Sequence, residues 1–247
     1  MRTRSPKSRV PKASTVRAML LGLVSAGMLA ACGQGPVKPP DRYYRMSLEP
    51  AARSSSKPLH GNLLVQRFRG DGLVSQRPLV YADRAQPETL SQYNYHFWTD
   101  TPTIHLQELA IDYLRSAALA PLVVSPDVRV DSRYELDGQI RRLEHLRALD
   151  ESGEPADQVA LSVEFTLMDN EERRVLLLER YSRVRAITPA GDDASSIRLE
   201  TTSTLNDAAR ALESAYAEIL DALLADIDAR DNAQIATAMG SAAASRP

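Results

Sequence analysis

The side chains best suited to chemistry in this sequence are one cysteine, Cys32, four histidines and many carboxylates. The histidines are widely spaced, at His60, His96, His105 and His145, and none stands four residues from another. Transition metals need thiolate and imidazole ligands gathered at short spacings. The sequence therefore predicts no metal site, and each histidine is expected to be a surface or partly buried group.

The sequence also lacks two common catalytic motifs. The sequence contains neither a G-x-S-x-G nucleophile turn nor a Walker-type glycine loop with its lysine. A carboxylate pair for hydrolysis is compatible with the composition, but no pair is marked by its context. We therefore expect a protein that is not an enzyme and holds no cofactor, with a lipid-anchored hydrolase as the lowest-ranked hypothesis.

The segment before Cys32 has the three regions of an export signal. Six basic residues and no acidic residue lie in 1–17, and residues 18–28 form an apolar run. That run is too short for a membrane span, which needs about 20 residues. Small residues then lead to the cysteine, and Gly33, Gly35 and Pro36 follow directly. These features favour a signal peptide over 1–31 rather than a short membrane anchor or a buried helix.

Leu29-Ala30-Ala31-Cys32 resembles the lipobox of bacterial lipoproteins at all four positions. The resemblance implies that the Cys32 thiol receives a diacylglyceryl group, the chain is cut before it, and the new amino terminus is acylated, typically with palmitate. Two or more acyl chains hold a protein on a membrane stably. Gly33 is not the aspartate associated with inner-membrane retention, so we expect the outer membrane, periplasmic face.

Processing changes the charge balance. The whole chain is formally −2, and removal of 1–31 takes away six positive charges and no negative charge, which leaves about −8. A nucleic-acid-binding protein needs a clustered basic footprint, so the sequence predicts no nucleic-acid partner.

The mature chain reads as a lipidated cysteine and tether (32–40), one domain (41–230) and a disordered tail (231–247). Residues 159–167 alternate apolar with small or polar side chains, as a half-buried strand does. They are followed by turn-forming residues and a return strand over 174–186, and a third strand is predicted over 134–141. Shorter candidates lie at 42–48, 62–68, 79–81 and 93–97.

Two helices are predicted. The first begins after Thr101-Pro102, an N-cap followed by a proline at the first helical position, and presents an apolar stripe from Leu106 to Ala117. The second covers about 204–229, with apolar residues at helical spacing and acidic residues opposite. The fold class predicted is α+β, a single domain with a mainly antiparallel sheet covered by two amphipathic helices.

Aromatic residues are concentrated in 79–102. Tyr93, Tyr95 and Phe97 are expected on one face of a strand, with Trp98 on the other. Core packing is one interpretation. The other is an interface for a partner or lipid, formed by Tyr81, Tyr93, Tyr95 and Trp98.

The order of these elements resembles the ABC-type transport auxiliary lipoproteins, the PqiC/YmbA-like family, over roughly 43–229. The residues that carry the resemblance are Tyr93-Asn94-Tyr95-His96-Phe97-Trp98 and Tyr134-Glu135-Leu136-Asp137-Gly138-Gln139-Ile140, together with the lipobox. The sequence departs from the family in a loop expected at 85–89 and in His96-Phe97 before the tryptophan.

The resemblance implies an accessory lipoprotein of an MCE/ABC-type intermembrane lipid transport system, which acts by docking. It implies an MCE-domain protein and an ABC permease as partners, and it allows a phospholipid ligand and a homo-oligomer. The alternative is a periplasmic regulator or assembly lipoprotein that binds an envelope enzyme or a β-barrel.

Overall fold

The computed structural model describes residues 38–52, 54–153, 156–188 and 200–244, and in the last range the side chains of 204–230. Cys32, its lipobox and most of the predicted tether lie outside the described residues. The residues from Asp41 onward form one compact unit. The predicted domain boundaries stay predictions.

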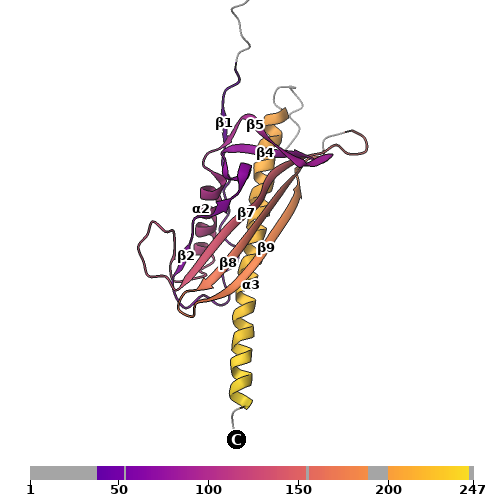
Figure 1. Ribbon diagram of the computed structural model, residues 1–247. Coiled ribbons are helices and arrows are strands. Elements are labelled where there is room, and N and C mark those ends of the chain that lie inside the picture. Colours follow the sequence, from indigo (N-terminus) through magenta and orange to yellow (C-terminus); the bar gives the residue numbers. More distant parts are fainter. Residues whose placement is uncertain (1–37, 53, 154–155, 189–199, 245–247) are drawn as a thin grey trace, which may run out of the picture. The chain divides into compact units, whose positions relative to one another are not determined.

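Nine strands, one short 3-10 helix and two α-helices follow one another in the described chain (Figure 1). In order they are β1 (Arg42–Tyr44), β2 (Leu63–Val65), β3 (Arg69–Gly70), η1 (Gly72–Ser75), β4 (Pro78–Asp83), β5 (Gln86–Trp98), α2 (Pro102–Ser116), β6 (Val123–Val124), β7 (Tyr134–Arg147), β8 (Gln158–Asp169), β9 (Arg174–Ala186) and α3 (Glu200–Ala244).

Strands β7, β8 and β9 form the predicted antiparallel meander, and β4 and β5 form an antiparallel hairpin. The remaining pairings are parallel: β1 with β5, β2 with β6, and β2, β3 and β4 with β7. The prediction of a mainly antiparallel sheet is therefore wrong, because the sheet is mixed. Parallel neighbours need long connections, and such non-local pairings leave no mark in the alternation of one segment.

Strand β7 is the centre of this sheet. One of its edges pairs with β8, from Tyr134 opposite Asp169 to Leu146 opposite Gln158. Its other edge is shared by β2 at the start of β7, β3 in the middle and β4 at the end. The succession of short strands along one long strand brings segments distant in sequence to a common edge.

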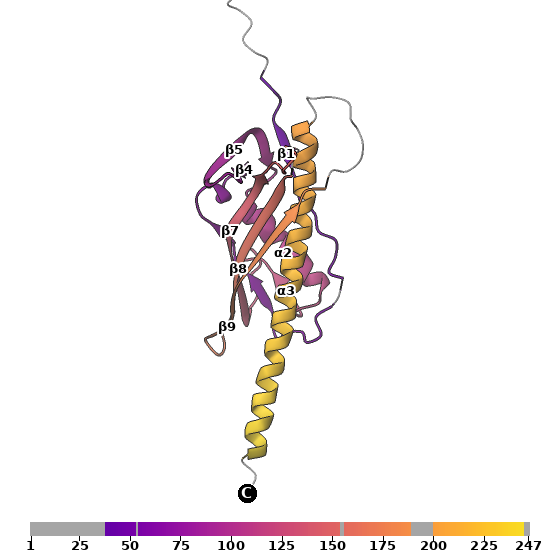
Figure 2. The same ribbon diagram turned by 90° about the vertical axis from the view of Figure 1, so that its right-hand side faces the viewer.

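Both helices pack on one face of the sheet, with α3 running along β8 and β9 (Figures 1 and 2). The apolar stripe predicted for α3 is buried throughout, and Tyr216 within it donates a hydrogen bond from its hydroxyl to the Leu106 carbonyl of α2 at 2.7 Å. The inward residues of β8 are buried against this helix, as the alternation predicts.

Helix α3 is longer than predicted, since it begins at Glu200 and continues to Ala244. Residues 231–244 are rich in alanine, which has the highest intrinsic helix propensity, so the backbone stays helical after the apolar stripe ends. The disorder predicted for 231–247 stays a prediction. Neither described helix has a stretch apolar enough to cross a membrane.

Candidate binding site

The parallel pairing of β4 with β7 creates a cluster of polar and aromatic side chains at one corner of the sheet. Tyr81 lies opposite His145, and Asp83 lies opposite Arg147. Residues two apart on a strand point to the same face, so these four side chains share one face. The pairing joins segments more than sixty residues apart, which sequence spacing does not reveal.

His145 is the centre of a hydrogen-bonded network. Its Nε2 lies 3.0 Å from Oδ2 of Asp157, and its Nδ1 lies 2.7 Å from the hydroxyl of Tyr93. Since a carboxylate only accepts, Nε2 carries the hydrogen in the neutral ring, and Nδ1 accepts from Tyr93. The second oxygen of Asp157 accepts from the backbone N–H of Ala148 at 2.9 Å.

Burial sets the protonation of this network. Burial lowers the pKa of His145 below its ordinary value, while the nearby Asp157 carboxylate acts in the opposite direction. Burial also raises the pKa of Tyr93 well above its ordinary value. At neutral pH the imidazole and the phenol of this network are therefore neutral, and each has its hydrogen-bonding partner.

Aromatic rings continue from His145 toward β1. The ring centroids of Tyr81 and Tyr93 are 4.5 Å apart, and those of Tyr93 and His96 are 5.9 Å apart. The hydroxyl of Tyr44 lies 2.8 Å from Nδ1 of His96. Burial lowers the pKa of His96, and the positive charge of Arg42 lowers it further.

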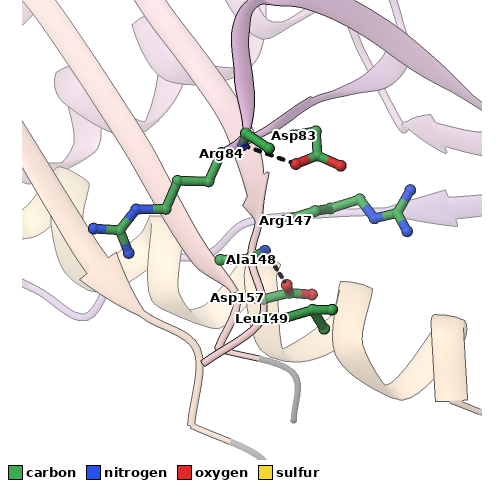
Figure 3. A pocket seen from close by; sticks show the side chains of 7 residues that line it. Asp83, Arg84, Arg147, Ala148, Leu149 and Asp157 are labelled. Atoms are coloured by element: carbon green, nitrogen blue, oxygen red, sulfur yellow. Dashed lines mark hydrogen bonds between the residues drawn. The ribbon is translucent and has the colours of Figure 1, made fainter. Parts of the chain in front are cut away.

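An open hollow of about 660 Å³ adjoins this network, between the β4–β5 turn and the segment after β7. It is lined by Asp83, Arg84, Ala85, Arg147, Ala148, Leu149 and Asp157. Figure 3 shows the side chains of Asp83 and Arg147 on the same side, while the Arg84 side chain points away. The volume falls within the range of about 300–1,000 Å³ that ligand sites occupy.

Two groups of the hollow that can contact a partner are Arg147 and Leu149. The Arg147 guanidinium lies 5.4 Å from the centre of the Tyr81 ring, a cation–π distance, and pairs with no carboxylate of the described residues. Leu149 is 71% exposed. Asp83 accepts from the Ala85 N–H at 2.9 Å, and Asp157 is occupied as described above.

This arrangement favours recognition over proton transfer. Both ring nitrogens of His145 are already hydrogen-bonded to protein groups, so the ring offers no lone pair to a substrate. Asp83, Arg147 and Leu149 face the solvent, and Arg147 with Leu149 forms a pair of one cation and one apolar side chain. Such a pair suits a partner that carries a carboxylate next to an apolar side chain.

The four predicted interface residues lie in different surroundings. Tyr81 and Tyr93 are half-buried members of the ring cluster behind the hollow, and Tyr95 is half-buried. Trp98 is 4% exposed and belongs to the main core. The burial of Trp98 agrees with the interpretation of core packing, and the interface role of these residues stays a prediction.

The predicted alternation along 93–98 is also wrong. Tyr95 has a φ of +64°, and the β4–β5 register shifts between Pro78 and Val80. A bulged residue interrupts the period of two, so Tyr93 and His96 come within ring contact although the alternation places them on opposite faces. The expected loop at 85–89 is likewise shorter, since β5 already begins at Gln86.

A second hollow, of about 160 Å³, lies at the other end of β7 to β9 beside α3. It is lined by Leu59, His60, Arg133, Tyr134, Leu167, Asp169, Glu172, Arg174, Leu176, Leu177, Ile227 and Arg230. Its volume is below that of small-molecule sites.

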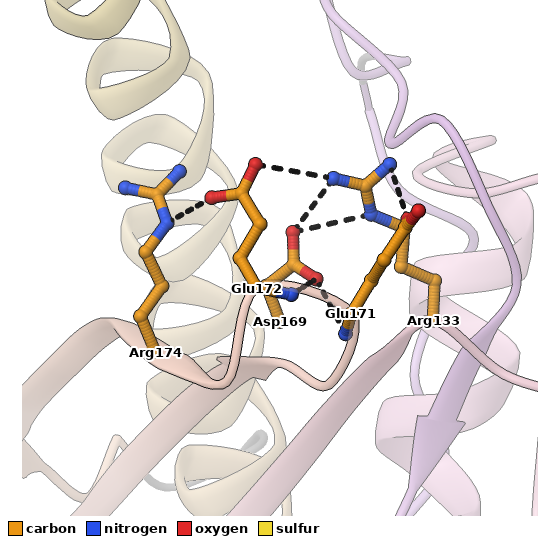
Figure 4. Close-up of polar contacts among 5 residues, drawn as sticks. All are labelled: Arg133, Asp169, Glu171, Glu172 and Arg174. Carbon is orange, nitrogen blue, oxygen red and sulfur yellow. Dashed lines mark hydrogen bonds and ion pairs between the residues drawn. The ribbon is translucent and has the colours of Figure 1, made fainter.

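Ion pairs join two arginines and three carboxylates beside the second hollow (Figure 4). Arg133 donates to Asp169 at 2.8 and 3.1 Å and pairs with Glu171 and Glu172, while Arg174 pairs with Glu172. Burial acts to raise the pKa of Asp169, but the bonds from Arg133 and from two backbone N–H groups outweigh it and hold the pKa below its ordinary value. This cluster fixes the β8–β9 turn.

The burial of the histidines differs from what the sequence predicts. His105 and His145 are both buried, contrary to prediction. Nε2 of His105 lies 3.0 Å from the Met46 backbone nitrogen and 3.1 Å from the Met46 carbonyl oxygen. Within the described residues, no group of three or more His, Cys, Asp or Glu side chains is placed to hold a metal ion.

Comparison with known proteins finds solved structures with a similar fold. No family model and no curated protein matches the sequence. Among solved structures, XCC0632 from Xanthomonas campestris, a DUF330 protein, superposes with a TM-score of 0.60 and 17% identity, over 78% of this chain and 99% of that chain. The fold resembles that of a DUF330 protein.

Two further structures are similar. An uncharacterized protein matches with a TM-score of 0.51 and 14% identity, over 76% of this chain and 99% of the other. A minor lipoprotein from Acinetobacter baumannii matches with a TM-score of 0.37 and 9% identity, over 66% and 93%, which is too low to carry an argument. At these identities the likeness shows the shared fold alone.

Proposed function

We propose that this protein is an envelope lipoprotein, held at the outer membrane by acylated Cys32, that serves an MCE/ABC-type lipid transport system as a docking component. The observation that carries the proposal is the fold likeness to XCC0632, which covers 99% of that chain. DUF330 is the PqiC/YmbA-like family, the same family that the sequence resembles through its tyrosine–tryptophan and Tyr-x-Leu-x-Gly-x-Ile segments.

The hollow beside Arg147 is the surface we assign to the partner. Its backing is rigid, because Tyr93, His145 and Asp157 connect β5, β7 and the segment before β8 through hydrogen bonds of 2.7 and 3.0 Å. A preorganised surface loses less conformational entropy on binding. The exposed Leu149 and the oriented Arg147 supply an apolar contact and a charged one.

The tether limits how far this surface stands from the lipid. Residues 33–40 number eight, and an extended chain spans at most about 3.3–3.6 Å per residue, so they reach about 25–30 Å. A partner that crosses the periplasm must therefore come to this domain near its membrane. That role fits an MCE-type protein.

The proposal is tested by crosslinking in living cells, gentle detergent extraction and mass spectrometry of what stays bound. Recovery of an MCE-domain protein or its permease supports the proposal. Recovery of an envelope enzyme or a β-barrel alone overturns it in favour of the regulator. Cys32→Ser is the matched control: it leaves the domain unchanged, and we expect it to leave the outer-membrane fraction and lose the partner.

A further inference from the structure

An aromatic patch lies at the edge of the sheet where the chain enters the domain. Tyr43 of β1 is 56% exposed and is the only aromatic residue among the exposed large apolar side chains of the described chain. It lies opposite Phe97 in the β1–β5 pairing, with ring centroids 5.8 Å apart. Phe97 is half-buried. The two rings form one patch of apolar surface.

A fixed guanidinium covers this patch. The Arg77 guanidinium lies 5.4 Å from the centre of the Tyr43 ring, and it donates to the carbonyls of Trp98 at 3.2 Å and Thr99 at 2.9 Å. These bonds orient the cation beside the aromatic ring. An exposed tyrosine with an adjacent arginine is typical of the interface between lipid and water, where the ring lies at headgroup depth.

Two more arginines flank Tyr43 and Tyr44 in the chain. Arg42 and Arg45 are exposed, and neither pairs with a carboxylate among the described residues. By the alternation of the strand Arg45 follows the Tyr43 face, whereas Arg42 shares the face of Tyr44 and lies opposite His96. Asp41 and Glu49 are the nearest carboxylates along the chain, and Asp100, Glu108 and Asp112 line a hollow together with Arg45. Arg45 and Arg77 supply guanidinium groups on the Tyr43 side of β1, and such groups suit phosphate headgroups.

The position of the patch in the chain restricts what can cover it. Tyr43 comes eleven residues after Cys32, so even a fully extended connection holds it within about 36–40 Å of an acylated Cys32. A flexible connection of that length has a typical span of only about 20 Å. The patch is therefore kept at a high effective concentration near the lipid surface.

We propose that the Tyr43–Phe97 patch rests on the bilayer surface, with the rings at headgroup depth and Arg45 and Arg77 toward lipid phosphates. This inference rests on the proposed lipidation of Cys32. The membrane contact then has two components, because the acyl chains hold the protein at the bilayer and the patch orients the domain on it.

The test uses the mature chain, residues 32–247, coupled through the thiol of Cys32, its only cysteine, to maleimide lipid in phosphatidylethanolamine–phosphatidylglycerol vesicles with brominated acyl chains. Tyr43→Trp places a fluorophore in the patch. Val175→Trp, at a position of similar exposure (54%) on β9, is the matched control. Trp98 is buried and gives both variants the same background.

We expect bromolipid to quench the added fluorescence of Tyr43→Trp and to leave that of Val175→Trp unchanged. Replacing Arg45 with glutamine should reduce the quenching. Equal quenching in both tryptophan variants, or none in Tyr43→Trp, overturns the inference. Hydrogen exchange of the unsubstituted protein gives a second measurement, since residues 42–46 should exchange more slowly on vesicles than in solution.

Chemical coupling replaces acylation, so this result does not depend on whether the cell modifies Cys32. The mass of the protein isolated from cells tests that modification separately. A result that overturns the membrane contact of the patch is therefore distinguishable from one that overturns the proposed lipoprotein function.

Discussion

The hydroxyl of Tyr93 on β5 donates a 2.7 Å hydrogen bond to Nδ1 of His145 on β7, across the intervening strand β4. The same imidazole donates from Nε2 to Asp157. One buried ring thus connects three segments around the hollow, and it gives the proposed docking surface a fixed backing.

Tyr93→Phe tests how much this hydrogen bond contributes to the free energy of unfolding. The substitution leaves Nδ1 of buried His145 without a donor, and an unsatisfied buried group costs about 1–3 kcal/mol. We expect the free energy of unfolding, measured by urea denaturation at pH 7.5, to fall by that amount. Tyr43→Phe, which removes an exposed hydroxyl, should change it by less than about 0.5 kcal/mol. Equal effects of the two variants would show that the Tyr93 bond adds no stability.

His145 should make stability depend on pH. Its pKa is lowered in the fold, whereas in the unfolded chain it titrates near 6.5. Below about pH 6.5 the unfolded state therefore binds more protons, and the free energy of unfolding falls as the pH falls, by at most about 1.4 kcal/mol per pH unit for one group. His96, whose pKa is lowered in the same direction, should add a smaller contribution.

The measurement is a series of denaturation curves between pH 7.5 and pH 5. We expect His145→Gln to flatten the pH dependence, and we expect the exposed His60→Gln to keep the wild-type slope. An identical slope in wild type and His145→Gln would exclude His145 as its source.

The ring of Phe68 explains why position 138 in the Tyr-x-Leu-x-Gly-x-Ile segment is a glycine. A Cβ at this position would lie 2.6 Å from ring atoms of Phe68, which is buried and in edge-to-face contact with Phe165. Gly138→Ala should therefore destabilise the domain by about 1–3 kcal/mol. Thermal unfolding of the two single variants and the double variant with Phe68→Leu forms a mutant cycle. Additive effects would contradict the predicted clash.

Asp169 should contribute more to the free energy of unfolding than its charged neighbours do. Its carboxylate is buried and accepts from Arg133 and from the backbone N–H groups of Glu171 and Glu172. Its pKa is lowered in the fold, so its stabilisation is present at pH 7 and is lost only as the pH falls through the acidic range. Asp169→Asn should lower the free energy of unfolding at pH 7 by about 1–3 kcal/mol.

Glu171→Gln is the control for Asp169, because the Glu171 side chain is 69% exposed in the same cluster. Exposed ion pairs contribute about 0–1 kcal/mol. A Glu171 effect as large as that of Asp169 would contradict the assignment of the turn to one buried carboxylate.

Much of this architecture is local and was predictable. The return strand after the turn at 170–173 occupies the predicted range 174–186, and the apolar stripe of α3 is buried as its helical period indicates. These features depend on the alternation of neighbouring residues, which sequence displays directly.

The unpredicted features are non-local. The parallel pairing of β4 with β7 places Tyr81 opposite His145, and no spacing rule connects residues so far apart. The left-handed backbone at Tyr95 shifts every later side chain of β5, although tyrosine gives no glycine-like signal for it. The candidate site depends on both, so sequence could name its aromatic residues but could not place His145 or Asp157 beside them.

We propose above that the hollow beside Arg147 receives a subunit of a lipid transport system. The most direct measurement places a photoreactive amino acid at Leu149, irradiates living cells, and identifies the adduct by mass spectrometry, with Val175 as the exposed control position on β9. We predict an adduct with an MCE-domain protein or its permease from position 149 and none from position 175. An adduct from position 149 only with an envelope enzyme or a β-barrel would contradict the claim.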